Sequence, residues 1–260
     1  YYINTHSDIN TPKRVTVNKV MDGLEVRVLE DNESINTLLE EYEITNPEFF
    51  NFKTSEGVDL NGFMIKPPDF NPRKKYPVLM FVYGGPSVQT VQNSWGGNRM
   101  LWHRYMASQG YIIACVDNRG TPARGESFKK STYMKLGELE TKDQIEAAQY
   151  LGSLSYVDKF RIGIWGWSFG GYMTALCLTK GAEIFKLGVS VAPVSNWRYY
   201  DTIYTERYLR TPQENPNGYD DNSPINFVKK LKGKLLLIHG MLDDNVHLQN
   251  TTEMIKKLVE

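Results

Sequence analysis

The pentapeptide Gly166-Trp167-Ser168-Phe169-Gly170 places a serine between two glycines, a spacing that can hold a nucleophile. The apolar run 161–165 before it is typical of a short buried strand, and residues 171–178 after it have the apolar spacing of a helix. A strand, a sharp turn and a helix around a central serine form the context of a nucleophile elbow. Glycines suit the flanks because a Cβ atom there would crowd the neighbouring backbone. The pattern predicts Ser168 as a nucleophile, against the alternative of a plain glycine-rich turn.

A carboxylate follows a later apolar strand, where a serine nucleophile needs its acid. A serine hydroxyl is a weak nucleophile until an imidazole takes its proton and an acid orients that imidazole. In α/β-hydrolases these groups follow one another as serine, acid, histidine. The run 235–239 reads as a buried strand, and Gly240 and Asp243 follow it, so Asp243 is the predicted acid. The alternative is that Asp243, like Asp244, caps the helix that begins near residue 247.

The histidine of this set is not found. The chain contains 4 histidines, namely His6, His103, His239 and His247. None of them lies in a loop beyond the acid, because His247 directly follows Asp243-Asp244-Asn245-Val246 on a helix start. We therefore expect the general base to lie beyond residue 260. Residues 1–260 alone are then expected to have negligible activity, since removal of the base costs several orders of magnitude in rate.

Negative charge that develops on an acyl oxygen needs preorganised donors. The backbone N–H of Phe169, directly after the nucleophile, is the first predicted donor. The second is expected after an earlier strand, where Tyr83-Gly84-Gly85-Pro86 ends the apolar run 77–83. The glycines let the backbone approach closely, and the Tyr83 hydroxyl can donate directly. The alternative is an ordinary turn with Tyr83 packed against the sheet.

The N-terminal stretch differs in pattern from the remainder of the chain. Residues 14–17 and 24–29 alternate like half-buried antiparallel strands. Residues 31–43 are polar and acidic and are predicted to be a linker with a short helix at 35–41. A second antiparallel pair is predicted at 48–53 and 60–66.

From residue 76 on, apolar strands alternate with helical segments. Strands are predicted at 77–83, 111–116, 162–165, 187–191 and 234–239, and helices at 100–108, 143–154, 172–178 and 248–259. Strands buried on both faces and separated by helices imply a mostly parallel sheet flanked by helices. The predicted class is therefore α/β, of the α/β-hydrolase fold, with a short antiparallel β segment at the N-terminus.

Composition argues against several classes of function. The 30 basic and 30 acidic residues cancel, so no bulk charge recruits nucleic acid or an anionic membrane. No apolar stretch approaches the roughly 20 residues that span a bilayer. No metal and no other cofactor is predicted, since His239 and His247 have no cysteine or further histidine nearby. Cys115 and Cys177 lie in apolar runs and are predicted to be buried free thiols.

Several motifs together resemble the prolyl oligopeptidase family of serine peptidases. They are Tyr83-Gly84-Gly85-Pro86, Asp117-Asn118-Arg119-Gly120, the elbow from Gly166 to Tyr172, and the segment from His239 to His247. The aromatic block from Ala192 to Tyr208 is similar to the dipeptidyl peptidase branch of that family, whose members remove X-Pro or X-Ala dipeptides from free N-termini. The resemblance covers essentially the whole chain.

The resemblance implies a β-propeller joined to a hydrolase domain. Residues 1–43 would be the last propeller strands and a linker, and residues 44–260 a catalytic domain that is incomplete at its C-terminus. Ser168 is the implied nucleophile, Asp243 the implied acid, and Tyr83 with the Phe169 amide the implied oxyanion hole.

The resemblance also implies a pocket for a proline ring. Its walls map onto Phe169, Val194, Trp197, Tyr200, Tyr204 and Val246. A proline ring is compact and apolar, so aromatic walls bury it well and exclude larger residues. Asn245 would hold the carbonyl of the residue before proline, and Arg207 would orient nearby side chains. Without the resemblance, the aromatic residues from 197 to 208 would be interpreted as core.

Three functions follow from these patterns. The first is a serine exopeptidase that releases N-terminal X-Pro dipeptides through an acyl-enzyme on Ser168. The second is an acylaminoacyl peptidase or esterase of the same fold, and the third is a non-catalytic interaction module. The expected partner is a peptide with proline in the second position. The resemblance is also compatible with a homodimer through the hydrolase domain and with a periplasmic, secreted or cell-surface location.

Overall fold

The computed structural model describes residues 1–42 and 44–260, and residue 43 lies outside the described part. Two compact units divide the chain. The first contains Tyr1–Phe49, Phe63–Phe70 and Gln92–Ile113, and the second contains Phe50–Gly62, Asn71–Val91 and Ala114–Glu260. The linker predicted for residues 31–43 thus ends outside the described residues, and the domain boundary at residue 43 stays a prediction.

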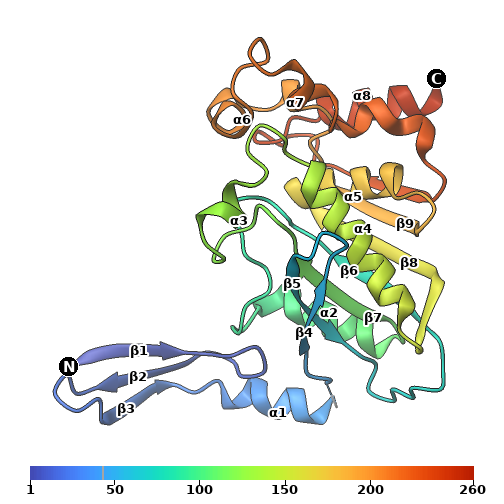
Figure 1. Ribbon diagram of the computed structural model, residues 1–260. Helices are drawn as coiled ribbons and strands as arrows, with labels where there is room; N and C mark the ends of the chain where they lie inside the picture. Colours follow the sequence, from blue (N-terminus) through green and yellow to red (C-terminus); the bar gives the residue numbers. More distant parts are fainter. Residues whose placement is uncertain (43) are drawn as a thin grey trace. The chain divides into compact units, whose positions relative to one another are not determined.

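A three-stranded antiparallel sheet opens the chain (Figure 1). Its strands are β1 (Tyr2–His6), β2 (Arg14–Asn18) and β3 (Glu25–Glu30), in that order. The sequence pattern predicts β2 and β3 but misses β1, because every residue of β1 is exposed and no alternation marks it. Helix α1 (Glu33–Glu41) follows, close to the helix predicted there.

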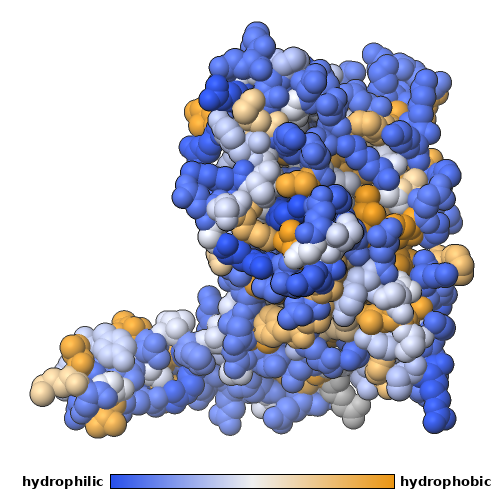
Figure 2. Space-filling view, in the orientation of Figure 1, coloured by the Kyte–Doolittle hydropathy of each residue, from blue (hydrophilic) through white to orange (hydrophobic). Residues whose placement is uncertain are grey.

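The surface of this small sheet carries apolar side chains. Figure 2 shows them in orange on the part of the molecule that Figure 1 labels β1 to β3. The exposed residues include Ile3 on β1 and Val26, Val28 and Leu29 on β3. Since β1 and β3 bury none of their residues, apolar burial contributes little to this sheet within its own strands.

A seven-stranded sheet forms the centre of the fold, with the order β10-β9-β8-β6-β7-β5-β4. Its strands are β4 (Glu48–Lys53), β5 (Asp59–Ile65), β6 (Tyr76–Phe81), β7 (Ile112–Asp117), β8 (Val157–Trp167), β9 (Phe185–Val191) and β10 (Lys234–Ile238). The pairs β6–β8, β8–β9 and β9–β10 are parallel. The sequence predicts all seven strands, and the parallel arrangement follows from the helices that separate them.

Helices connect the strands. They are α2 (Gly97–Ser108), α3 (Glu126–Lys130), α4 (Glu138–Ser153), α5 (Phe169–Lys180), α6 (Thr202–Leu209), α7 (Pro216–Asp220) and α8 (Gln249–Val259), with 3₁₀ turns η1 (Trp197–Tyr199) and η2 (Pro224–Lys230). Figure 1 shows α4 and α5 side by side over the sheet, and both contact β8. Helix α5 is buried along its length except at Lys180. The helix that starts at Ser168 is therefore anchored in the core of the second unit.

Two predictions about single residues can be compared with the structure directly. Cys115 on β7 and Cys177 on α5 are both buried thiols outside any disulfide, as predicted. Helix α6 was missed, although Asp201 caps it by accepting a hydrogen bond from the Tyr204 backbone N–H at 2.8 Å. The helix is too short for apolar periodicity to mark it, and only its cap residue signals its start.

His103 on α2 gives the first unit a predicted dependence on pH. It is 1% exposed, and burial, assisted by the charge of Arg99, lowers the pKa of His103 to about 3 from 6.5. Below pH 6.5 the unfolded chain therefore binds a proton at His103 that the folded chain does not bind. The stability from this group is full above pH 6.5 and falls as the pH is lowered. The free energy of unfolding should drop by roughly 2 to 3 kcal/mol from this group between pH 6.5 and 4.5.

Urea unfolding at both pH values measures this effect. His103→Gln, which cannot take up a proton, should lose less stability than the parent between pH 6.5 and 4.5. A His103 imidazole that titrates near 6.5 by NMR, or identical pH profiles for parent and variant, would contradict the prediction.

Candidate active site

Ser168 lies at the bend between β8 and α5. Its backbone has φ 59° and ψ −118°, a left-handed conformation that non-glycine residues rarely adopt and that stores strain. Two hydrogen bonds hold the bend, since the Ser168 N–H donates to the Val191 carbonyl at 2.9 Å and the Ser168 carbonyl accepts from Tyr172 N–H at 3.0 Å. Because Ser168 is only half-buried, its hydroxyl can be reached from outside.

Close backbone packing explains the glycines that follow the serine. A Cβ atom on Gly170 would lie 2.1 Å from the carbonyl oxygen of Val82, and one on Gly171 would lie 2.5 Å from that of Val191. Helix α5 therefore rests directly on the backbone at the carboxyl ends of β6 and β9, the two strands that flank β8. This contact fixes the position of the bend.

Seven of the predicted site residues meet in one small pocket of about 30 Å³. They are Tyr83, Ser168, Phe169, Val194, Trp197, Tyr200 and Tyr204. The rings form a continuous wall, with Trp197 stacked on Tyr204 at 6.1 Å between centroids and Tyr200 edge-on to Tyr204 at 5.4 Å. Residues that are far apart in the sequence thus enclose an apolar space beside the serine hydroxyl.

Polar groups on this wall have different surroundings. The Tyr200 hydroxyl donates to Asn245 Oδ1 at 2.7 Å, which brings Asn245 to the edge of the pocket. The Tyr204 hydroxyl is buried and has no hydrogen-bond partner among the described residues. Burial raises the pKa of Tyr204 and of Tyr200, so both phenols are neutral at physiological pH.

Tyr83 and Phe169, the residues predicted to supply donors, lie beside Ser168. The two rings lie 6.0 Å apart, and both residues line the pocket with Ser168. Burial raises the pKa of Tyr83, so its hydroxyl keeps its proton at neutral pH. Phe169 is the first residue of α5, and the first amides of a helix have no acceptor within the helix. Both residues therefore bring a hydrogen-bond donor to the pocket beside Ser168.

Asp243 lies in the loop after β10. Its Oδ1 atom accepts from the N–H groups of Asn245 and Val246 at 3.1 and 2.9 Å. The other carboxylate oxygen, Oδ2, is 3.4 Å from Nε2 of His239. Helix α8 begins later, at Gln249, and has no side-chain cap. The alternative that Asp243 caps this helix is therefore wrong.

His239 is held by other groups on both of its ring nitrogens. Nε2 lies 2.6 Å from the Val246 carbonyl oxygen, and Nδ1 lies 2.7 Å from the Thr251 hydroxyl. A carbonyl oxygen can only accept, so Nε2 donates to it, while Nδ1 shares a hydrogen bond with the Thr251 hydroxyl. His239 thus supports the loop that carries Asp243.

Val246, predicted for the pocket wall, and Arg207, predicted to orient nearby side chains, are not among the residues that line the pocket. Val246 is buried, but its backbone serves the loop, where its N–H binds Asp243 and its carbonyl binds His239. Arg207 is exposed on α6. The sequence shows how far these two residues lie from the pocket residues along the chain. It does not show in which direction the backbone turns at either of them.

Asn250 on α8 supports the pocket and was missed by the sequence analysis. It is fully buried, accepts from the Ser195 N–H at 2.9 Å and donates to the Tyr199 carbonyl at 3.3 Å. The Ser195 hydroxyl in turn donates to the Asn250 carbonyl at 2.6 Å. These bonds fix the segment that carries Val194 and Trp197. The only signal in the sequence was an amide side chain at a position of the predicted helix 248–259 that faces the core.

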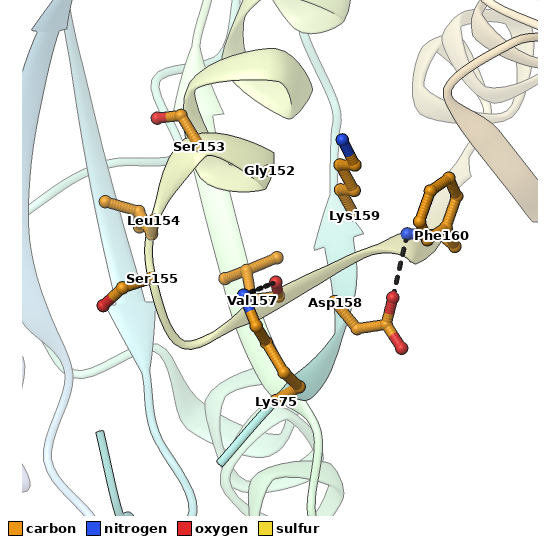
Figure 3. A pocket seen from close by; sticks show the side chains of 9 residues that line it. All are labelled: Lys75, Gly152, Ser153, Leu154, Ser155, Val157, Asp158, Lys159 and Phe160. Atoms are coloured by element: carbon orange, nitrogen blue, oxygen red, sulfur yellow. Dashed lines mark hydrogen bonds between the residues drawn. The ribbon is translucent and has the colours of Figure 1, made fainter. Parts of the chain in front are cut away.

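A larger pocket of about 380 Å³ lies at the opposite end of β8 (Figure 3). It is formed by residues 152–155 at the end of α4, by the start of β8 and by Lys75. Figure 3 shows the Asp158 carboxylate turned to the Phe160 N–H, which donates to it at 3.0 Å. Ligands of open α/β sheets bind at the carboxyl ends of the strands, and this pocket is at the amino end. Size alone therefore does not make it the reactive site.

In the part of the chain that the structure describes, no group of three or more His, Cys, Asp or Glu side chains could hold a metal ion. Among the same residues, no helix has the length and apolar character needed to cross a membrane.

A serine hydroxyl at a strained strand-to-helix bend, on a mostly parallel sheet flanked by helices, defines an α/β-hydrolase fold. The chain belongs to the prolyl oligopeptidase family, because the model of that family matches residues 99–260. Both the fold class and the family agree with the predictions from sequence.

Similar proteins include dipeptidyl peptidases. A probable dipeptidyl-aminopeptidase B of Botryotinia fuckeliana is 41% identical over 99% of this chain and 28% of its own length. A dipeptidyl peptidase 4 of Trichophyton equinum is 39% identical over 100% of this chain and 34% of its own length. The crystal structure of Porphyromonas gingivalis dipeptidyl peptidase 4 has a TM-score of 0.95 and 48% identity, covering 99% of this chain and 36% of that chain. The chain thus spans about a third of the length of these relatives.

Proposed function

We propose that the chain is part of a serine dipeptidyl peptidase that releases N-terminal X-Pro or X-Ala dipeptides. The observation that carries this proposal is the aromatic pocket beside Ser168. Its walls, which include the rings of Phe169, Trp197 and Tyr204, suit a compact apolar ring and oppose larger side chains. The names of the relatives support the same reaction.

The reaction follows from the residues at the bend. Ser168 Oγ attacks the carbonyl carbon of the proline in the pocket, while a general base takes the hydroxyl proton. The carbonyl oxygen becomes an anion that the Tyr83 hydroxyl and the Phe169 N–H stabilise. The C–N bond then breaks, and the amine leaves with the proton that the base returns. Water then attacks the ester on Ser168 while the same base takes its proton. The base returns that proton to the serine oxygen as the dipeptide is released.

The proposed reaction also needs an acid and a general base, which are Asp243 and a histidine. Asp243 would orient the imidazole and stabilise its charged form. We propose that the imidazole belongs to none of the four histidines of the chain, since both ring nitrogens of His239 are occupied. Residues 1–260 alone should then have negligible peptidase activity, and turnover of an X-Pro chromogenic substrate by this stretch would contradict that.

The experiment that tests the proposed function uses the full-length protein. It should cleave an X-Pro-p-nitroanilide and should be labelled by a fluorophosphonate on Ser168, as peptide mass spectrometry reports. A protein that hydrolyses only simple esters or N-acylated substrates would favour an esterase or acylaminoacyl peptidase. A protein that is neither labelled nor active would favour an interaction module.

Tyr204→Ala should damage proline substrates selectively. Loss of this ring removes apolar contact worth about 2 to 3 kcal/mol, so kcat/KM for X-Pro-p-nitroanilide should fall roughly 10²-fold. Hydrolysis of p-nitrophenyl acetate should change by less than about 3-fold, since the acetyl group does not fill the pocket. Equal losses on both substrates would instead favour the esterase reading.

Two variants serve as controls for Tyr204. Tyr204→Phe keeps the ring and removes only a hydroxyl without a partner among the described residues, so proline turnover should persist. Tyr208→Ala removes a neighbouring ring on α6, 4.9 Å from Tyr204 between centroids but outside the pocket lining. It should leave the preference for proline unchanged.

The remaining predictions about the whole protein are also proposals. We propose that residues 1–43 are the end of a propeller and residues 44–260 a catalytic domain. We further propose that the protein acts in the periplasm, outside the cell or on its surface, and that it forms a homodimer through the hydrolase domain. Sedimentation of the full-length protein tests the last point.

A further inference from the structure

Two neighbouring side chains at the carboxyl end of β7 hold the loop that follows Tyr83. Asn118 is fully buried, and its Nδ2 atom donates to the Gly84 carbonyl at 3.0 Å and to the Arg119 carbonyl at 2.7 Å. Asp117 is 5% exposed and accepts from the N–H groups of Thr90 and Val91 at 3.0 and 2.9 Å. One residue therefore binds the start of the loop and the other binds its end.

A second amide fixes the orientation of Asn118. Gln144 on α4 donates from Nε2 to Asn118 Oδ1 at 2.9 Å and to the Val116 carbonyl at 2.9 Å. The Asn118 amide is thus bound on both its donor and its acceptor side, and it cannot rotate without breaking buried hydrogen bonds. The chain of contacts runs from α4 through Asn118 to the residue after Tyr83.

The backbone of the loop leaves room for the Asn118 amide. Gly84 has φ +79°, and a Cβ atom there would lie 2.8 Å from Asn118 Oδ1. A Cβ atom on Gly85 would lie 2.8 Å from the Tyr83 ring. Glycine is therefore required at position 84 by both conformation and space. Any shift of the Gly84 carbonyl moves the adjoining Tyr83.

At neutral pH the charge of Asp117 strengthens the hydrogen bonds at the end of the loop. Burial raises the pKa of Asp117 to about 6, while its hydrogen bonds from Val91 and Thr90 oppose the rise. The side chain is therefore a carboxylate at neutral pH and binds both amides strongly.

We propose that Asn118 and Asp117, with Gln144 behind them, are positioning residues that hold the Tyr83 hydroxyl where the oxyanion forms. The proposal rests on the proposed role of Tyr83 and extends it to three residues that touch no substrate. Electrostatic stabilisation depends on preorganised donors, and a displacement of about 1 Å can cost roughly 10²-fold in rate.

A double-mutant cycle in the full-length protein tests this proposal. Asn118→Ala should lower kcat for X-Pro-p-nitroanilide by about 10- to 10²-fold and change KM by less than about 3-fold, because the loop acts on the transition state. In a Tyr83→Phe background, which lacks the hydroxyl, the same substitution should lower kcat by less than about 2-fold. Equal effects in both backgrounds would overturn the proposal.

Asn215→Ala is the matched control. Asn215 also donates from Nδ2 to two carbonyls, those of Met134 and Leu209, both at 2.9 Å, but it precedes α7 and these partners lie outside the loop. Its loss should lower the melting temperature to a similar extent and leave kcat within about 2-fold. A fall in kcat equal to that of Asn118→Ala would mean that lost stability alone explains the effect.

Two further measurements keep the proposal testable if Asn118→Ala folds poorly or the parent has no peptidase activity. Gln144→Met removes the bond behind Asn118 with little change in volume and should lower kcat by a smaller factor. Amide hydrogen exchange of residues 84–91 should be faster in both variants and unchanged in Asn215→Ala, whatever the substrate. Inactivity of the parent defeats the proposed function, whereas unchanged exchange of this loop defeats the positioning role.

Discussion

Replacing Ser168 by alanine should lower kcat of the full-length protein by about 10⁶-fold, the loss expected when the nucleophile of such a unit is removed. The hydroxyl at this bend is the only atom of the pocket proposed to form a covalent bond with substrate. Turnover of X-Pro-p-nitroanilide and labelling by a fluorophosphonate measure the loss together. Both should disappear, because each requires the same oxygen.

Ser190→Ala is a suitable control for this experiment. Ser190 is fully buried on β9 and donates to the Gly171 carbonyl at 2.8 Å, so its loss costs about 1 kcal/mol of stability without touching the pocket. Its kcat should stay close to that of the parent. Residual turnover above 1% in purified Ser168→Ala, or labelling at another serine, would show that the nucleophile has been misassigned.

Asp243→Asn should lower kcat by about 10⁴-fold, because an amide cannot stabilise the charged imidazole or hold its correct tautomer. The fold should be preserved, since an asparagine oxygen can still accept from the N–H groups of Asn245 and Val246. Circular dichroism and melting temperature should therefore resemble those of the parent. The effect should appear in kcat measured at saturating substrate.

The neighbouring Asp244 provides the comparison. It is exposed, and Asp244→Asn removes the same charge one residue away. Asp244→Asn should change kcat by less than about 2-fold. A loss of similar size in the two variants would indicate a general effect of negative charge on this loop and would remove Asp243 from its proposed role.

Local patterns were sufficient for the centre of the fold and for the nucleophile bend. The apolar run before Ser168 and the helical spacing after it predict β8 and α5, and the glycines predict the close packing that the bend requires. The position of Asp243 after β10 also follows from order along the chain. These features depend on residues that are near one another in the sequence.

Features that depend on contacts between distant residues were not predictable in this way. Asn118 and Gly84 are 34 positions apart, and Ser195 and Asn250 are 55 positions apart. No local periodicity records such pairs, so both supports of the pocket were missed. The same reason explains why Val246 was expected in the pocket wall, although it is not among the residues that line the pocket. Strand β1 was missed because it buries no side chain.

The two buried thiols allow the unfolding of the second unit to be measured by chemical labelling. Cys115 and Cys177 are both 0% exposed, and burial raises the pKa of Cys177, which keeps it protonated and unreactive. One thiol belongs to a strand in the middle of the sheet and the other to the helix that carries the nucleophile bend. A maleimide can reach either sulfur only when these elements separate, so the rate of alkylation in native buffer measures how often the catalytic core opens.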